Sequence, residues 1–129
     1  MDISASGLTA QTARMRVIAQ NLANANTTPS SPTEKPYQRQ IVTFRNVFDR
    51  VEGAHKVAVA GVTKDKSPFG KRYEPTNPAA DKSGYVQTPN VAVLVETMDM
   101  RAAQRNYEAN LTVIEASRTM MARTLDLLK

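Results

Sequence analysis

The sequence contains no cysteine and no tryptophan, and only one histidine, His55, among its 129 residues. The absence of cysteine excludes disulfides, thiolate zinc sites and cysteine nucleophiles. A single histidine excludes multi-histidine metal centres and argues against a Ser-His-Asp triad. No glycine-rich phosphate loop is present either, since Ser67-Pro-Phe-Gly70 lacks that pattern. We therefore expect no enzyme, no cofactor and no metal, and we interpret His55 as a solvated loop residue.

Aromatic residues and long apolar runs are also scarce. Three Phe and four Tyr provide little material for a compact core. The longest apolar run, Val91–Val95, is far shorter than the roughly 20 residues that cross a bilayer, so we expect no direct membrane insertion. Near the N-terminus, Arg14 and Arg16 interrupt the apolar stretch that a secretory signal would need, and we expect no cleaved signal peptide.

Residues that break regular structure are concentrated in the middle of the chain. All seven prolines and four of the five glycines lie within residues 28–90, and these two residue types interrupt helices and strands most strongly. We predict an α+β fold in which a long N-terminal helix (1–27) and a long C-terminal helix (91–129) pair as a coiled-coil-like hairpin. The middle (28–90) forms a small domain rich in strands and loops.

The N-terminal segment carries one apolar stripe at helical spacing, made of Leu8, Met15, Ile18 and Leu22. Ser4 or Ser6 is a candidate cap for its first turn. The helix is expected to end in the asparagine-rich stretch before Pro29, because asparagine tolerates the left-handed conformation found at helix C-termini. Three residues at this exit are candidates for a functional motif: Asn21, Asn24 and Thr27.

The C-terminal segment has a seven-residue apolar repeat that is typical of a coiled-coil seam. Charges along it balance in sign, Glu96 among them. The methionines of this segment are interpreted as adaptable packing residues rather than metal ligands. The main row consists of Val93, Met100, Tyr107, Ile114, Met121 and Leu128, with Leu111 and Leu125 beside it and the small or polar Ala103, Asn110, Ser117 and Thr124 at the +3 positions.

The middle segment has strand composition at residues 37–44 and 56–62, with a possible third strand at Tyr85-Val86. Asp81 and Ser83 beside Gly84 favour a turn. Ten basic and six acidic residues lie within 28–90. These basic residues are dispersed with few aromatics among them, so we do not expect nucleic-acid binding.

The predicted C-terminal helix is too long for the domain that should bury it. From Val91 to Leu127 it would extend about 54 Å, whereas a compact globule of this size is about 36 Å across. Apolar surface left uncovered is worth about 25 cal/mol per Å² when something buries it. We infer that other chains supply the missing cover.

The segment Ser6–Thr27, with Asn21-Leu-Ala-Asn24 at its core, resembles the N-terminal signature of bacterial flagellar rod and hook proteins. Further blocks are similar to rod proteins of that family, and together they extend over nearly the whole chain in order. These blocks are Pro36–Phe44, Ser67–Phe69, Gly84–Val91, Met98–Met100 and Arg105–Asn110.

The resemblance implies a structural subunit of the basal-body rod in the periplasm. It implies that the terminal helices pack with neighbouring subunits into a helical tube, which encloses the export channel and transmits torque. Expected partners are copies of the chain, other rod and basal-body proteins, and the flagellar export apparatus, with no small-molecule substrate.

The residues expected to make the helix packing come from both ends of the chain. A soluble adaptor whose helical hairpin binds a single partner helix remains the alternative, and a basic nucleic-acid-binding domain is a more distant one. The packing candidates are Leu8, Met15, Ile18, Leu22, Met100, Tyr107, Leu111, Ile114, Met121, Leu125 and Leu128.

Overall fold

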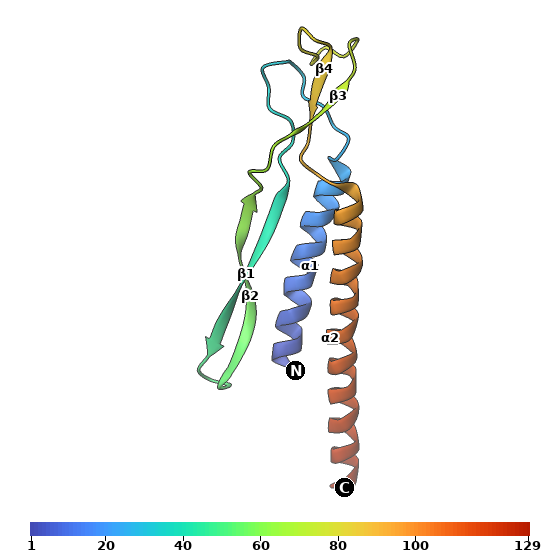
Figure 1. The fold of residues 1–129 in the computed structure, drawn as a ribbon. Coiled ribbons are helices and arrows are strands. Elements are labelled where there is room, and N and C mark those ends of the chain that lie inside the picture. The colour runs from blue at the N-terminus through green and yellow to red at the C-terminus, as the bar shows by residue number, and fades with distance from the viewer. The chain divides into compact units, whose positions relative to one another are not determined.

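The computed structural model describes residues 1–129 and confirms the α+β class: in chain order, a long helix at each end flanks a middle of antiparallel strands (Figure 1). β1 pairs with β2 and β3 pairs with β4, so the structure contains two separate two-stranded sheets. The elements in chain order are α1 (Asp2–Ala23), β1 (Gln40–Asp49), β2 (Ala54–Lys64), β3 (Gly70–Tyr73), β4 (Tyr85–Thr88) and α2 (Val93–Leu127).

The chain forms two compact units, and each contains parts of both helices and of the middle. The division into segments 1–27, 28–90 and 91–129 therefore stays a prediction. Unit 1 consists of Met1–Met15, Val42–Gly61 and Arg101–Lys129, and unit 2 consists of Arg16–Ile41 and Val62–Met100.

The start of α1 differs from the expectation. The helix already begins at Asp2, and the Ser6 hydroxyl donates a hydrogen bond to the Ile3 carbonyl inside the helix. Neither Ser4 nor Ser6 is therefore an N-cap. Both lie within the helix, where a serine hydroxyl can bond to a carbonyl of the preceding turn instead of capping.

The end of α1 also differs from the expectation. No residue other than glycine has a positive φ, so no asparagine adopts the left-handed conformation. The last turn instead tightens through hydrogen bonds from the Ala25 amide to Leu22 O and from the Thr27 amide to Asn24 O. Such i to i−3 bonds satisfy the terminal carbonyls without a left-handed residue.

In both units α1 lies against α2. In unit 1 a Cβ placed on Gly7 would lie 2.8 Å from Asn110 Nδ2, and in unit 2 the Asn21 side chain bonds to Glu96. Each unit thus contains its own contact between α1 and α2.

In unit 1, the hairpin of β1 and β2 lies against the first turns of α1. Lys56 Nζ lies 2.9 Å from Asp49 Oδ2, 3.0 Å from Glu52 Oε2 and 3.8 Å from Asp2 Oδ2. Hydrogen bonds to Asp49 and Glu52 raise the pKa of Lys56 to about 12. The amide of Val57 also donates to the Ser6 hydroxyl. One lysine thus connects both ends of the hairpin turn to the helix.

The strand predictions are correct in part. The strand expected at 37–44 begins only at Gln40, because the Arg39 amide bonds to the Asn90 side chain instead of a neighbouring strand. It continues to Asp49. β2 and β4 confirm the other two expectations. β3 was missed, and His55 lies in β2 rather than in a loop, with its ring against Phe48.

In unit 2, β3 and β4 pair from Gly70 opposite Thr88 to Tyr73 opposite Tyr85, where the two rings meet edge to face at 5.3 Å. The predicted turn before β4 is confirmed, since Asp81 Oδ1 accepts hydrogen bonds from the amides of Ser83 and Tyr85. Gly84 closes this turn with a φ of 85°.

Replacing Gly84 by alanine tests this turn. A Cβ there would lie 2.7 Å from Tyr73 Cε2, and the positive φ disfavours any L side chain. We expect the Gly84→Ala variant to lose about 1–2 kcal/mol of unfolding free energy, measured by urea denaturation. Gly61→Ala is the matched control, because a Cβ at that position meets nothing within 4 Å. Equal stability of the two variants would contradict the assignment.

Candidate functional site

A cluster of polar side chains is buried in unit 2, and Asn21 of α1 lies at its centre with 1% of its surface exposed. Asn21 Nδ2 donates to Gln40 O at 2.9 Å and to Glu96 Oε2 at 3.3 Å. Its Oδ1 accepts from the Tyr37 hydroxyl at 2.8 Å and from the Gln40 amide at 3.0 Å. Because an asparagine side chain has two donor hydrogens and an oxygen that accepts twice, Asn21 is fully satisfied. It joins α1, the start of β1 and α2.

Glu96 of α2 is a charged member of this cluster, and it is completely buried. Arg39 Nε donates a hydrogen bond to Glu96 Oε1, and the Arg39 side chain is 22% exposed. The same guanidinium reaches Asp65 at 3.2 Å and Asp99 at 3.8 Å. Burial lowers the pKa of Arg39, but the hydrogen bonds to Glu96 and Asp65 outweigh it and raise the pKa. The buried carboxylate is thus paired, as a charge in such a place must be.

Asp65 and Asn90 extend the cluster toward the strands. Asn90 Oδ1 accepts from the Arg39 amide at 2.7 Å, and its Nδ2 donates to the carbonyls of Asp65 and Ser67. Hydrogen bonds from the Ser67 hydroxyl and amide lower the pKa of Asp65, and Arg39 adds to this effect. On the other side of the cluster, burial and the nearby charge of Glu96 raise the pKa of Tyr37.

The three residues predicted at the helix exit separate into two roles. Asn21 enters the buried cluster, whereas Asn24 and Thr27 bond locally: Asn24 Nδ2 to Gln20 O at 2.8 Å and Thr27 Oγ1 to Asn24 O at 2.7 Å.

Sequence reasoning missed Arg39, Asp65, Asn90 and Glu96. The signal available for Glu96 was its position seven residues before Ala103, in the row of small residues that lies against α1.

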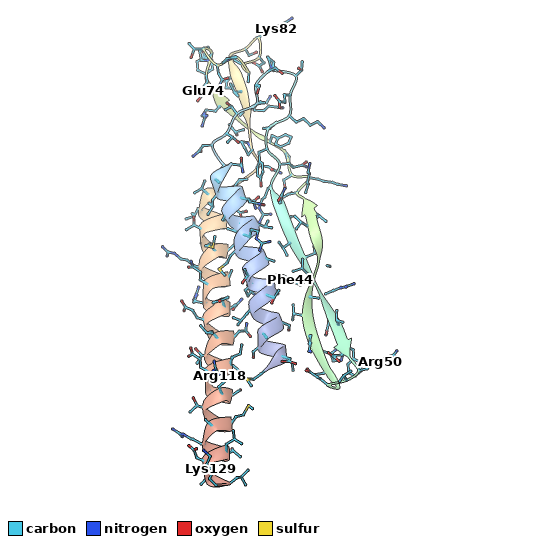
Figure 2. All side chains as sticks on the ribbon, turned by 180° about the vertical axis from the view of Figure 1, so that it is seen from behind. Phe44, Arg50, Glu74, Lys82, Arg118 and Lys129 are labelled. Carbon is cyan, nitrogen blue, oxygen red and sulfur yellow. The ribbon has the colours of Figure 1, made fainter.

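A second candidate surface lies on α2 in unit 1. In the last turns of α2 the large apolar side chains are more than half exposed, namely Met120, Met121, Leu125, Leu127 and Leu128. Figure 2 marks this part of α2 by Arg118 and Lys129. We call Ser117–Leu128 the overhang. It carries a shallow apolar groove lined by Ser117, Met120, Met121, Thr124 and Leu125.

The predicted packing residues are placed unevenly. Ile18 is buried, and most of the other candidates next to a paired stretch of helix are half-buried. In the overhang, Met121 is 54% exposed, Leu125 60% and Leu128 79%. Their role in packing against other chains stays a prediction. The half-buried candidates are Leu8, Met15, Leu22, Met100, Tyr107 and Ile114, whereas Leu111 is exposed.

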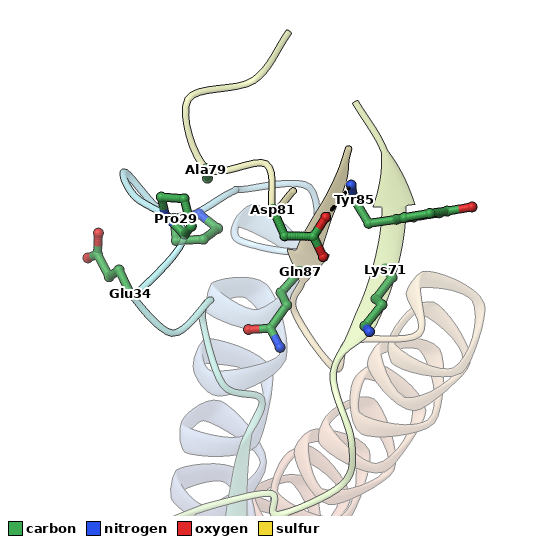
Figure 3. Close-up of a pocket in the computed structure, with 8 residues that line it drawn as sticks. Pro29, Glu34, Lys71, Ala79, Asp81, Tyr85 and Gln87 are labelled. Carbon is green, nitrogen blue, oxygen red and sulfur yellow. Dashed lines mark hydrogen bonds between the residues drawn. The ribbon is translucent and has the colours of Figure 1, made fainter. Parts of the chain in front are cut away.

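Unit 2 also contains a cavity of about 190 Å³ between the 29–34 loop, β3 and β4 (Figure 3). Glu34, Lys71 and Asp81 are the charged residues of its lining, and Asp81 already accepts the hydrogen bond from the Tyr85 amide that Figure 3 marks.

No group of three or more His, Asp or Glu side chains is arranged to hold a metal ion. No helix has the length and apolar content needed for a membrane span.

Comparison with known proteins gives matches at both ends and over the full length. The family described as "Flagella basal body rod protein" matches residues 1–29, and "Flagellar basal body rod FlgEFG protein C-terminal" matches residues 82–127. The chain is 46% identical to the flagellar basal-body rod protein FlgC of Agrobacterium fabrum, over 98% of this chain and 91% of that protein. The FlgC proteins of Salmonella typhimurium and Bacillus subtilis are 40% and 36% identical, with 98% of this chain and 93% and 95% of those proteins covered.

A double-mutant cycle tests the buried ion pair. Arg39→Met leaves the Glu96 carboxylate buried without its cation, and we expect a loss of about 2–3 kcal/mol in unfolding free energy, because Arg39 is partly exposed. Adding Glu96→Leu should recover at least about 1 kcal/mol, since both charges are then removed. The exposed pair Arg105→Met and Glu108→Leu is the control, with less than about 0.5 kcal/mol expected for each change. If the losses of unfolding free energy from Arg39→Met and Glu96→Leu simply added, the coupling between the two side chains would be contradicted.

The lowered pKa of Asp65 predicts a pH dependence. A carboxylate whose pKa is lower in the folded state stabilises the protein above its unfolded pKa of about 3.9, and this contribution is lost as the pH falls through the folded value. We therefore expect the Asp65→Asn variant to be less stable than the parent above about pH 5. The difference should shrink progressively below about pH 4. Urea denaturation of both proteins across this range checks the expectation, and a constant difference would refute it.

Proposed function

This chain belongs to the FlgC family of flagellar basal-body rod proteins, and from this premise we propose that it builds the rod by burying the overhang of α2 against neighbouring subunits. It is a structural subunit of the flagellar basal-body rod and assembles there with other rod proteins. The proposal concerns which surface makes that assembly.

The continuity of one seam carries the proposal. Along α2 the row Glu96, Ala103 and Asn110 lies against α1, and Ser117 and Thr124 continue the same seven-residue spacing into the overhang. There the seam gains the large apolar side chains of Met120, Met121 and Leu125, which are exposed. An exposed apolar strip that continues an existing helix interface favours a further helix as its cover. In a rod, neighbouring subunits supply such helices.

The wider consequences rest on the family resemblance together with this seam. The paired helices form the inner layer of a helical tube that encloses the export channel. Because close-packed helices cannot bend without opening contacts, this layer transmits torque. Copies of this chain and other rod proteins cover the overhang, and the subunit reaches its site through the flagellar export apparatus without a cleaved signal peptide.

The proposed role is mechanical and not catalytic. The buried carboxylate, Glu96, is saturated by Asn21 and Arg39 and has no opening to a substrate. The polar side chains around the unit 2 cavity include no hydrogen-bonded pair of nucleophile and base. These observations support a function based on packing alone.

Replacing Leu125 by aspartate tests the overhang. Leu125 is 60% exposed, so the variant should fold with less than about 0.5 kcal/mol change in unfolding free energy. In the assembled rod the carboxylate would be buried without a partner, and we expect incorporation into rods and swimming motility to fall at least tenfold. Thr119→Asp is the matched control, because Thr119 is exposed and lies about 200° around the helix from Met121.

Ile114→Asp is the companion variant within the paired stretch. Ile114 is half-buried, so this change should lower both monomer stability and assembly. Normal rods from the Leu125→Asp variant would refute the role of the overhang. Binding of one partner helix at fixed stoichiometry, with no extended stack, would favour the soluble adaptor instead.

A further inference from the structure

The hairpin of β1 and β2 in unit 1 carries a surface that the proposed function does not use. Six consecutive residues of β1, Thr43–Phe48, are exposed. Successive side chains of a strand point to opposite faces, so a strand covered on one face shows buried and exposed residues in alternation. The unbroken exposure of Thr43–Phe48 means that neither face of this part of β1 is covered.

The outer edge of β1 is also accessible. The amide of Val57 in β2 donates a hydrogen bond to the Ser6 hydroxyl, so β2 turns its own edge toward α1. Near the hairpin turn, β1 is the strand farther from α1 (Figure 1 and Figure 2). In a sheet of two strands, the outer edge of each strand has unpaired backbone groups at every second residue. Proline and lysine commonly protect such edges, and β1 contains neither.

One face of the hairpin near its turn is rich in aromatic side chains. Phe44, Asn46 and Phe48 alternate along β1, and His55 of β2 lies on their face, because its Nδ1 is 3.0 Å from Asn46 Oδ1 and its ring contacts Phe48. A groove of about 290 Å³ passes Phe44, Asn46, His55 and Val57. Two of the three phenylalanines of the chain are therefore exposed on one short strand, where they offer apolar area to a partner.

The charges of the hairpin favour an acidic partner. Residues 42–61 contain three basic and two acidic residues. Lys56 holds both carboxylates, Asp49 at 2.9 Å and Glu52 at 3.0 Å, whereas Arg45 and Arg50 are exposed and lie outside these ion pairs. A second copy pairing along β1 would bring its own arginines to the same edge, and like charges on adjacent strands are destabilising.

We propose that the outer edge of β1 binds an extended acidic segment of another protein, which adds to the hairpin as a third strand. Its apolar side chains would cover Phe44 and Phe48, and a carboxylate would pair with Arg45 on the opposite face. Because side chains alternate between faces, the segment should alternate apolar and acidic residues. This contact is separate from the overhang, so either assignment can fail without the other.

A synthetic peptide tests the proposal on the full chain. The probe is Thr-Val-Glu-Val-Asp-Val-Glu-Val with blocked ends and a fluorescent label. One control peptide has lysine at each acidic position, and another has the same composition with its valines and acidic residues in separate blocks. By fluorescence anisotropy, we expect the alternating acidic peptide to bind at least about tenfold more tightly than either control.

Hydrogen exchange distinguishes strand addition from contacts made by side chains alone. Strand addition gives hydrogen-bond partners to the outward amides of β1, so exchange at alternate amides within Thr43–Phe48 should slow at least about tenfold when the peptide is bound. Binding without slower exchange in this segment would overturn the third strand.

A charge reversal tests the role of Arg45. The Arg45→Glu variant should lose at least about tenfold in affinity for the acidic peptide and should bind the lysine peptide instead. Arg45 is exposed, so the variant should fold, and the gained affinity for the lysine peptide would show that the hairpin is intact. Arg101→Glu is the matched control, an exposed arginine of α2 in the same unit, and it should leave both affinities unchanged.

Three further outcomes would overturn the proposal. The first is no preference of the parent chain for the alternating acidic peptide. The second is slower exchange in Thr43–Phe48 when the chain alone is concentrated, which would make a second copy the occupant. The third is binding to phosphatidylglycerol vesicles that Val51→Ser in the hairpin turn abolishes, with no binding of the peptide, which would assign the hairpin to a membrane surface.

Discussion

The buried contact of Glu96 with Asn21 and Arg39 is the interaction on which the arrangement of the helices depends. The buried apolar residues are small, four of the seven being alanines, and the largest fully buried side chains are Glu96, Val86 and Asn21. Small side chains remove little apolar area from water, so they contribute little free energy and fit many relative positions. A polar cluster in which each group has its partner accepts only one arrangement. Here the polar contacts select one arrangement of the buried side chains, whereas the apolar contacts favour association with other subunits.

One seven-residue repeat on α2 therefore serves two purposes along its length. In its first half the repeat presents short residues such as Ala103 and Asn110, which permit the close approach of α1 at Gly7. In its last quarter the same face presents methionine and leucine, which are exposed. Methionine is flexible and packs well against surfaces of differing shape. This change of side-chain size along one row separates the intramolecular contact from the surface available to other subunits.

The sequence was sufficient to predict the two helices but not the buried polar cluster. The absence of glycine and proline after residue 90 predicted α2 to within two residues of its start, because a long uninterrupted repeat has few alternatives. The serine cap, the left-handed asparagine and the loop position of His55 were wrong, since each depended on backbone geometry at a single residue. β3 was not predicted, because Lys71 and Arg72 are not residues typical of strands. Glu96 was named only among the balanced charges of the C-terminal segment. Its partner Arg39 lies 57 residues away, and periodicity contains no information on such contacts.

An uncovered seam is also a hazard, because apolar strips on free subunits favour aggregation. The overhang limits this hazard by its own composition. Arg118 and Arg123 lie among its apolar residues and outnumber the single acidic residue, Asp126, and the chain carries a net charge of +5. Like charges repel at the distances where nonspecific association begins, and the repulsion is overcome only where a partner provides close packing along the whole strip. Association is thus reserved for a surface with the matching helical repeat.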